Sequence, residues 1–412
     1  MSTETSRERV RAALNHQETD RVPVDFGGSR ITGIGALAYK DLLNHLGMRE
    51  DLYLYDNKQQ LADPSLAMIN RLGGDVLQLH RLGPSTGMPF LRVDRWKPSQ
   101  LTDGTPCLVP EDYQSRVACD GAFEILHNGL VYARRNPESF YFDVCYAPFQ
   151  NASSKAAIDA FEFPDPWSER EELYLKERIQ ALYHGTDKAL FAGLPLMNCS
   201  FLEMSLVLFG FENFMMTLID DPGLIEYWLD KMLAHDLVIL EQFLAIAGPY
   251  IEAIQMNDDF GAQDSLQIAP SVYREIFKPR QKKWIEFVKA RTNAKVFIHC
   301  DGAVEEIIPD FIEIGIDILN PLQTSAKGME PGKIKAKYGR DLSFWGGGVE
   351  TQSTLPFGTV KDIKLEVRER LKLLGKGGGF VFGTIHNIQP DIPPEKILAV
   401  FDTAAEFGQY PL

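Results

Sequence analysis

The sequence predicts a closed (β/α)8 barrel, and three observations support this fold class. Short apolar segments recur along the 412 residues, rich in β-branched or aromatic residues and without polar alternation. Such segments are typical of strands buried on both faces. Amphipathic segments of helical periodicity separate them. The chain is long for one domain, but barrels with insertions reach this length.

The expected elements follow one another as strand and helix. An open doubly wound sheet is the alternative, but its GxGxxG turn is absent, since the first strand is followed only by Gly27-Gly28-Ser29-Arg30. The predicted strands are Val22–Phe26, Asp75–His80, Ala189–Leu194, Glu252–Asn257, Lys295–His299, Ile316–Asn320, Leu342–Gly346 and Gly379–Gly383. The clearest helical segments are Pro222–Ala247, Ala269–Ala290, Val304–Ile314, Val360–Leu374 and Pro394–Phe407.

The segment Pro89–Phe149 has a different pattern. Turn signals such as Asp120-Gly121 and Asn128-Gly129 alternate there with short β-like runs. This predicts a β-meander inserted between the second and third barrel strands. We therefore expect residues 1–412 to form a single barrel domain, with the insertion 89–149 covering the barrel mouth. Its aromatic residues Phe140, Tyr141 and Phe142 are expected to contact substrate.

Composition and charge exclude several classes of protein. Lys and Arg number 42 against 57 Asp and Glu, giving a net charge of −15. Such an acidic surface repels nucleic acid and anionic membranes. No run of 18 uncharged apolar residues exists, and Met1–Arg11 lacks the apolar core of a signal peptide. The five cysteines form no CxxC pair, which indicates free thiols and a cytoplasmic protein.

Polar residues gather where the predicted strands end, the place where barrels carry their chemistry. Asp75 instead begins the second strand. The residues at or just past strand ends are Asp25, Ser29, Arg30, His80, Asn198, Cys199, Asn257, Asp258, Asp259, Gln263, His299, Cys300, Asp301, Asn320, Gln323, Trp345, Thr384, His386 and Asn387.

Three of these residues have the chemistry of metal ligands. His299 and Asp301 stand two residues apart at a strand end, so their side chains can converge on one point. His386 occupies the matching position after the eighth strand. Two imidazoles and a carboxylate can hold Zn²⁺. The alternative is a capping aspartate beside a hydrogen-bonded histidine.

The remaining candidates divide into catalytic and substrate-binding residues. Of the adjacent pair Asp258 and Asp259, one is expected to cap the following turn, and the other to position substrate, ligate the metal or transfer a proton. We also assign a catalytic role to His386. Trp345 is more typical of packing, but it stays a candidate for substrate contact. The candidate substrate-binding residues are Asp75, Gln263, Asn320, Gln323, Trp345 and Arg30.

Four motifs resemble the uroporphyrinogen decarboxylase superfamily over nearly the whole chain. The resemblance implies a distorted (β/α)8 barrel, in agreement with the strand count, and a homodimer. The motifs are Asp20-Arg21-Val22-Pro23-Val24, Asn257-Asp258-Asp259-Phe260-Gly261-Ala262-Gln263, Phe297-Ile298-His299-Cys300-Asp301-Gly302-Ala303-Val304, and Gly383-Thr384-Ile385-His386-Asn387-Ile388-Gln389-Pro390 followed by Pro393-Pro394-Glu395.

The decarboxylase branch of this superfamily is a poor match. Its members bind a tetrapyrrole through an arginine-rich loop, which here retains only Arg30. Asp75 resembles their pyrrole-binding aspartate, and His386 resembles their C-terminal histidine. The other carboxylate-binding residues are missing, and a net charge of −15 is unsuited to an eight-carboxylate substrate.

The other branch contains zinc methyltransferases that work with corrinoid proteins or coenzyme M. Their ligands are His-x-Cys plus a later Cys. This chain has His299, but Asp301 and His386 stand where the cysteines are expected. One carboxylate leaves a bound Zn²⁺ formally +1, which favours polarising an oxygen over activating a thiol.

The resemblance therefore predicts a zinc-dependent methyltransferase that moves a methyl group from a small O-methyl or related substrate to Co(I). The cobalamin would be carried by a separate corrinoid protein, because the chain has no Asp-x-His-x-x-Gly segment. Two alternatives stay open. One is a decarboxylase or lyase acting on a small carboxylate, and the other is a binding protein without catalysis.

Overall fold

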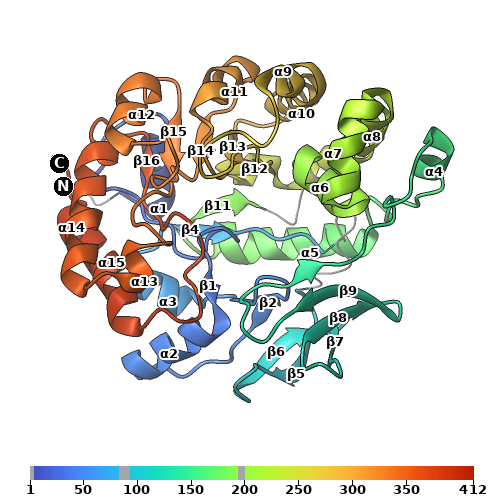
Figure 1. Ribbon diagram of the computed structural model, residues 1–412. Coiled ribbons are helices and arrows are strands. Elements are labelled where there is room, and N and C mark those ends of the chain that lie inside the picture. Colours follow the sequence, from blue (N-terminus) through green and yellow to red (C-terminus); the bar gives the residue numbers. More distant parts are fainter. Residues whose placement is uncertain (1–3, 83–92, 194–199) are drawn as a thin grey trace.

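The computed structural model describes residues 4–82, 93–193 and 200–412, and its centre is a seven-stranded parallel sheet (Figure 1). The strands lie side by side in chain order. Apolar side chains on both faces explain why these segments showed no alternation. The strands are β4 (Val76–Gln78), β11 (Ala189–Ala192), β12 (Ala253–Asn257), β13 (Lys295–His299), β14 (Ile318–Asn320), β15 (Ser343–Trp345) and β16 (Phe380–Val381).

An eighth segment links the two edges of this sheet. The Asp25 amide donates to the carbonyl of Phe382, just past β16, at 2.7 Å, and the Asp75 amide donates to the Val24 carbonyl at 2.7 Å. Seven of the eight predicted segments are strands of this sheet, and Val22–Phe26 joins its two edges through single contacts, so the fold is an α/β barrel-like one. Leu194, the predicted end of the third segment, lies outside the described residues.

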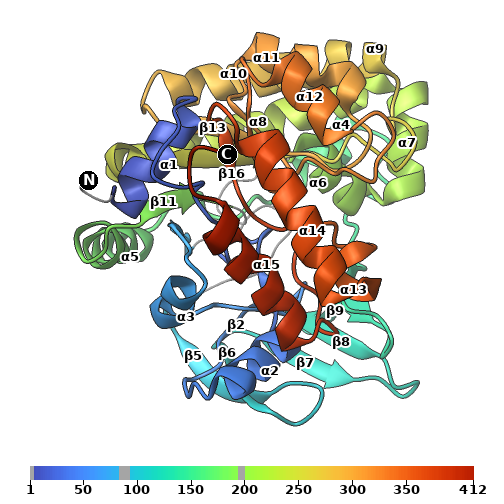
Figure 2. The ribbon, with the colours of Figure 1, turned by 90° about the vertical axis from the view of Figure 1, so that its left-hand side faces the viewer.

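Helices follow the strands and surround the sheet, and Figure 2 shows α14 and α15 side by side. The predicted helices Pro222–Ala247 and Pro394–Phe407 have the predicted bounds. The α-helices are α1 (Ser6–Leu14), α2 (Ala36–Leu46), α3 (Leu66–Arg71), α4 (Lys155–Asp159), α5 (Glu169–Ile179), α6 (Phe201–Phe209), α7 (Phe211–Asp220), α8 (Pro222–Ala247), α9 (Pro270–Val272), α10 (Lys278–Lys289), α11 (Ile308–Ile314), α12 (Pro331–Tyr338), α13 (Thr354–Phe357), α14 (Val360–Arg370) and α15 (Pro394–Phe407).

Helix α8 is apolar for a reason visible in its packing. With the turn that follows it, it is long and apolar enough to cross a membrane by length and composition alone. Half of that stretch is buried inside the molecule. Trp228, Ile239 and Phe243 on this helix are fully buried in the core. Burial against the rest of the chain accounts for its composition.

Antiparallel strands fill the chain between β4 and β11, where the sequence predicted an insertion. They lie below the parallel strands in Figure 1, whereas α9–α12 lie above. Pro89, the predicted start of the insertion, lies outside the described residues. Asn128 and Gly129 both have positive φ, as a tight hairpin turn requires. The strands are β5 (Trp96–Gln100), paired with β6 (Pro106–Pro110), and the meander β7 (Gln114–Val117), β8 (Phe123–His127), β9 (Leu130–Arg135) and β10 (Asp143–Val144).

A second, small antiparallel sheet lies in the chain between Val22–Phe26 and β4. It consists of β1 (Ile34–Gly35), β2 (Leu54–Asp56) and β3 (Leu61–Ala62). The turn between β2 and β3 lies against the insertion, because the Phe142 amide donates to the Lys58 carbonyl at 2.9 Å. This turn is important for the site described below.

Aromatic side chains pack inside the barrel. The ring centroid of Phe297 lies 4.9 Å from that of Phe191 and 5.6 Å from that of Trp345. Trp345 is almost fully buried, and its indole nitrogen donates to Asp25 Oδ2 at 2.7 Å. Trp345 therefore fills the barrel interior, in agreement with its interpretation as a packing residue, and this position does not support the alternative of substrate contact.

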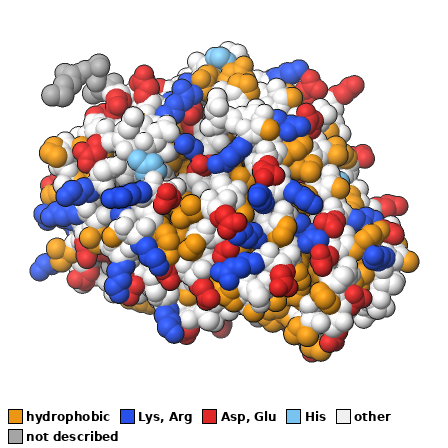
Figure 3. Space-filling model, turned by 90° about the horizontal axis from the view of Figure 1, so that it is seen from above, with side chains coloured by type: hydrophobic (Ala, Val, Ile, Leu, Met, Phe, Trp, Pro, Cys, Tyr) orange, Lys and Arg blue, Asp and Glu red, His pale blue; other side chains and the backbone are white. Residues whose placement is uncertain are grey.

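The molecular surface mixes both signs of charge. Figure 3 shows Lys and Arg side chains interspersed with Asp and Glu over the face seen from above. On this face the basic side chains form no continuous stripe of the kind that follows a phosphate backbone.

Candidate functional site

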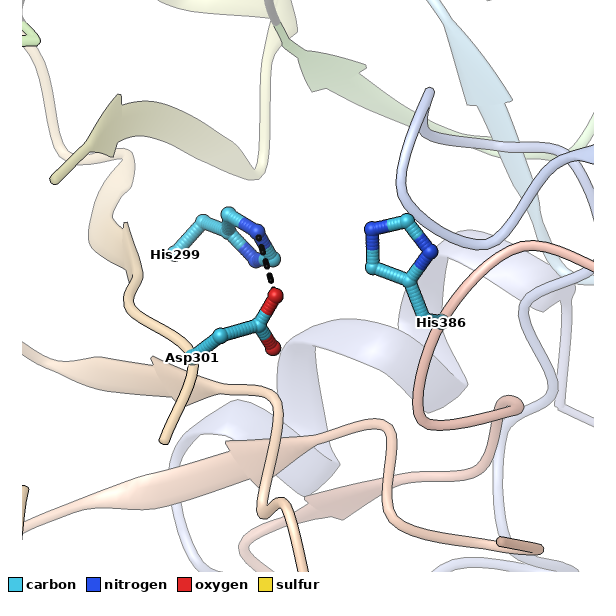
Figure 4. Close-up of side chains that lie close together, drawn as sticks. All are labelled: His299, Asp301 and His386. Carbon is cyan, nitrogen blue, oxygen red and sulfur yellow. Dashed lines mark ion pairs between the residues drawn. The ribbon is translucent and has the colours of Figure 1, made fainter. Parts of the chain in front are cut away.

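Three predicted ligands converge at the ends of the barrel strands. His299 is the last residue of β13, Asp301 follows two residues later, and His386 lies in the loop after β16. One ligand atom from each lies within 4.8 Å of the other two. His299 Nε2 is 3.6 Å from Asp301 Oδ2, and His386 approaches from the opposite side (Figure 4).

Asn320 fixes the orientation of His299. Its Oδ1 lies 2.8 Å from His299 Nδ1, and its Nδ2 donates to the Trp345 carbonyl at 2.6 Å. Because Asn320 Nδ2 donates to the Trp345 carbonyl, its Oδ1 faces His299 and accepts a hydrogen bond from Nδ1. His299 Nε2 is then left with its lone pair directed towards Asp301. This arrangement is typical of metal-binding histidines. Asn320, predicted to bind substrate, is a positioning residue.

The loop that carries Asp301 is held by a chain of polar contacts. The Asp301 amide donates to Asp259 Oδ1 at 2.8 Å, and the Gly302 amide donates to Gln323 Oε1 at 2.7 Å. Gln323 Nε2 in turn donates to Gln263 Oε1 at 3.0 Å. Gln263 and Gln323 were also predicted to bind substrate. The structure shows both supporting the loop, and their binding of substrate stays a prediction.

The electrostatics of the three residues suit a cation. Burial lowers the pKa of His386 to about 3, with contributions from His299 and Arg30, so this imidazole is neutral at physiological pH. Burial also acts to lower the pKa of His299, but the carboxylates Asp301 and Asp259 raise it overall. Burial raises the pKa of Asp301. A divalent cation would relieve the repulsion among these carboxylates, so the donor set fits a metal such as Zn²⁺.

The adjacent aspartates after β12 have different environments. Asp258 is fully buried and accepts hydrogen bonds from the Leu202 amide at 2.6 Å and from Gln281 Nε2 at 3.1 Å. It therefore caps the start of α6, and the structure removes it from our catalytic candidates. Asp259 Oδ1 lies 3.9 Å from His299 Nε2, and burial followed by Asp301 raises its pKa. Of the pair, Asp259 is the one at the metal-binding cluster.

Glu203, in the first turn of α6, is a site residue that the sequence analysis missed. It accepts a hydrogen bond from Ser200 Oγ at 2.9 Å and another from Asn257 Nδ2. Burial and the nearby Asp259 raise its pKa to about 7, against the effects of His299 and Lys58. One signal could have identified it, because it is the single charged residue in the segment Phe201–Phe209.

The insertion brings one aromatic residue to this cluster. The Tyr141 ring lies 6.4 Å from that of His386, and its hydroxyl accepts a hydrogen bond from Gln389 at 2.6 Å. Phe142 is buried under Arg135, and Phe140 is 41% exposed. Only Tyr141 of the three predicted aromatic residues thus faces His386.

Asp75 lies at the other end of the barrel. It precedes β4 and is fully buried, with Arg9 Nη1 at 2.8 Å, Arg21 Nη1 at 2.7 Å and the Val24 amide at 2.8 Å. These partners satisfy its oxygens, so the structure corrects our expectation that it binds substrate. Cys300 also faces away, since it is buried and accepts the Phe260 amide. Asn198 and Cys199 lie outside the described residues.

Comparison with known proteins identifies the family. Residues 149–407 match the model of the family described as Uroporphyrinogen decarboxylase (URO-D). The chain belongs to the uroporphyrinogen decarboxylase family. A curated relative, uroporphyrinogen decarboxylase from Thioalkalivibrio sulfidiphilus (strain HL-EbGR7), is 23% identical over 270 residues, which cover 63% of this chain and 71% of the relative.

A solved structure supports the fold of the URO-D chain over its whole length. It is a methyltransferase from Methanosarcina mazei that is 18% identical to this chain in sequence. The match covers 98% of this chain and 99% of the methyltransferase chain. The TM-score is 0.59. At this identity the likeness shows the shared fold alone.

Proposed function

We propose that this URO-D family member is a zinc-dependent methyltransferase. It would move a methyl group from a small O-methyl or related substrate to the Co(I) of a corrinoid protein. The observation that carries the proposal is the convergence of His299, Asp301 and His386 on one point. By the resemblance, these residues occupy the positions of the zinc ligands in the methyltransferase branch, with Asp301 and His386 in place of two cysteines. The name of the Methanosarcina neighbour agrees with this choice.

The ligand set favours oxygen substrates. With two neutral imidazoles and one carboxylate, Zn²⁺ would keep a formal charge of +1 and would polarise the ether oxygen that bears the methyl group. Asn320 keeps His299 Nε2 directed at the ligand set, and the low pKa of His386 keeps its nitrogen unprotonated.

Glu203 is the best-placed proton donor for the departing oxygen. With a pKa of about 7, it holds its proton in a substantial fraction of molecules at neutral pH. An acid whose pKa lies near the working pH is an efficient general acid. Asp259 lies 3.9 Å from His299, and its charge helps to raise the pKa of Glu203. We therefore assign proton donation to Glu203, with Asp259 supporting it.

The methyl acceptor would arrive on another protein. Since the chain has no cobalamin-binding Asp-x-His-x-x-Gly segment, the cobalamin belongs to a corrinoid partner. An in-line attack on the methyl carbon would then require the partner to present its corrin ring at the strand ends where the three ligands lie.

Decarboxylation of a small carboxylate is the second candidate. It is favoured by the name of the curated relative and by the position of Arg30 near His386. Binding of a tetrapyrrole is disfavoured, because the residue that resembles the pyrrole-binding aspartate, Asp75, is enclosed by Arg9 and Arg21.

A single-turnover experiment distinguishes the two. We expect Co(I) absorbance of free cob(I)alamin, or of a corrinoid protein, to decay when the zinc-loaded protein receives an O-methyl compound. The His386→Ala variant should show no decay, and coenzyme M or homocysteine should not replace the corrinoid. If methyl ethers, methylamines and betaines all leave Co(I) unchanged while a carboxylate substrate releases CO₂, the decarboxylase is the correct function.

A further inference from the structure

Two cationic side chains stand beside the metal-binding cluster, on the loop after Val22–Phe26 and on the β2–β3 turn. Arg30 is close enough to His386 to contribute to its lowered pKa, and Lys58 opposes the raised pKa of Glu203. The turn is fixed in place on both sides. The Phe142 amide donates to the Lys58 carbonyl at 2.9 Å, and Asn387 Nδ2 donates to Gln59 Oε1 at 2.9 Å.

The hydrogen-bonding groups of Arg30 and of the β2–β3 turn are only partly satisfied. Arg30 Nε pairs with Asp56, but Arg30 Nη2 is buried without a partner. Lys58 is partly buried, and within the described residues its ammonium makes no hydrogen bond or ion pair. The side-chain amide of Asn57, the residue between Asp56 and Lys58, is buried with neither atom bonded. A buried polar group without a partner is costly, and two such groups, Arg30 Nη2 and the Asn57 amide, lie on or against one turn.

The charges of Arg30, Asp56 and Lys58 do not balance. Arg30 and Asp56 form a neutral pair, which leaves the single positive charge of Lys58. Burial and then the neighbouring Arg30 lower the pKa of Lys58, so the two cations repel each other. A monoanion between them would supply the missing acceptor and balance the charge.

We propose that Arg30 Nη2 and Lys58 Nζ bind a carboxylate of the methyl donor, so that the substrate is a small methyl ether bearing one carboxylate group. The assignment rests on the proposed function, since it places the methylated oxygen at His299, Asp301 and His386. Repulsion from Asp259 favours this orientation, because it keeps the substrate carboxylate on the cationic side. A doubly charged phosphate would exceed the one unbalanced positive charge.

Binding measurements without any corrinoid test this subsite. The probes are methoxyacetate, 3-methoxypropanoate and 4-methoxybenzoate, each paired with its neutral amide, and calorimetry on the zinc-loaded protein gives the Kd. We expect at least one acid to bind about tenfold or more tightly than its amide. The Lys58→Met variant should weaken the binding of that acid by about 10- to 100-fold, the usual contribution of a hydrogen bond to a charged group. Its amide should be unaffected.

Two control variants make the result specific. Lys58→Arg keeps the charge and should retain most of the preference for the acid. Lys364→Met removes an equal charge from an exposed position on α14 and should change neither Kd. The proposal is overturned if no acid binds more tightly than its amide, or if Lys58→Met weakens acid and amide equally. Acid preference that depends on Lys58 without any loss of Co(I) would instead refute methyl transfer and leave the carboxylate subsite standing.

Discussion

The two ends of the barrel use the same residue types in opposite ways. At the end where the strands begin, Asp75 is fully buried between Arg9 and Arg21, and its oxygens are satisfied. At the end where they finish, Asp259 and Asp301 lie together, and burial raises the pKa of both. The first arrangement is balanced by the chain itself. The second could be balanced by a bound cation, as we propose.

The comparison shows how a structural cluster of buried charge differs from a binding site. Removing one partner of a buried ion pair leaves an uncompensated charge, so the first cluster must stabilise the fold. Carboxylates that repel one another gain from losing a charge or from binding a metal, so we propose that the second cluster serves binding. The following predictions test this difference, starting from the largest effect.

Asp75→Ala should destabilise the protein by about 3–5 kcal/mol, because Arg9 and Arg21 lose a buried partner. Asp301→Ala in the metal-free protein should cost less than about 1 kcal/mol, since it relieves repulsion with Asp259 and Glu203. Urea unfolding of both variants gives the two values. Equal losses of stability would show that the two ends do not differ in this way.

Glu203→Gln should slow methyl transfer by about 100-fold or more while zinc stays bound, because a general acid contributes about 10² to 10⁴ in rate. In the unmodified protein the rate should fall as pH rises through about 7, where Glu203 loses its proton. The variant should lack this decline. Asp259→Asn should slow transfer without releasing zinc. A variant that keeps the decline would assign the proton to another group.

Asn320→Ala should weaken zinc binding by about 10- to 100-fold, the usual effect of removing the group that orients a ligand histidine. His299 Nδ1 would lose its acceptor, and the ring would no longer be held with Nε2 towards Asp301. Competition with a chelator of known affinity measures the change. Unchanged affinity would mean that His299 is not a ligand.

The smallest effects are expected in the insertion. Phe140→Ala, at an exposed position, should change stability by less than about 0.5 kcal/mol and leave zinc content unchanged. Tyr141→Phe removes the hydrogen bond to Gln389 beside His386, and should alter substrate preference more than zinc content. Rates with two methyl ethers of different size give the preference. If Phe140→Ala alters it more than Tyr141→Phe does, Phe140 is the residue that contacts substrate.

The sequence predicts the strands and the convergence of His299, Asp301 and His386 well, for a simple physical reason. Strands buried on both faces are continuously apolar, and polar residues directly after them must gather at one end of a parallel barrel. His299, Asp301 and His386 follow this rule, and the structure brings them together. Asp75 precedes its strand, so the same rule places it at the far end.

Other features require the three-dimensional structure. Glu203 is in the first turn of a helix, and contacts from Asn257 and Asp258, at the end of β12, bring that turn to the site. Asn320 follows the strand-end rule, but its contact with His299 depends on how neighbouring strands align. Lys58 lies on a turn far from every barrel strand in sequence. Side-chain contacts between elements decide these roles, and local sequence pattern does not contain them.

The zinc content of purified protein tests the central claim, that the unbalanced end of the barrel holds a metal. We expect about one zinc per chain by mass spectrometry. The His386→Ala variant should lose most of this zinc while its fold stays intact. The double variant Asp301→Cys, His386→Cys should retain the zinc and should also accept thiols. The Asp75→Asn variant should retain its zinc under conditions in which it stays folded. Full zinc content in His386→Ala, or none in the unmodified protein after incubation with zinc, would contradict the account.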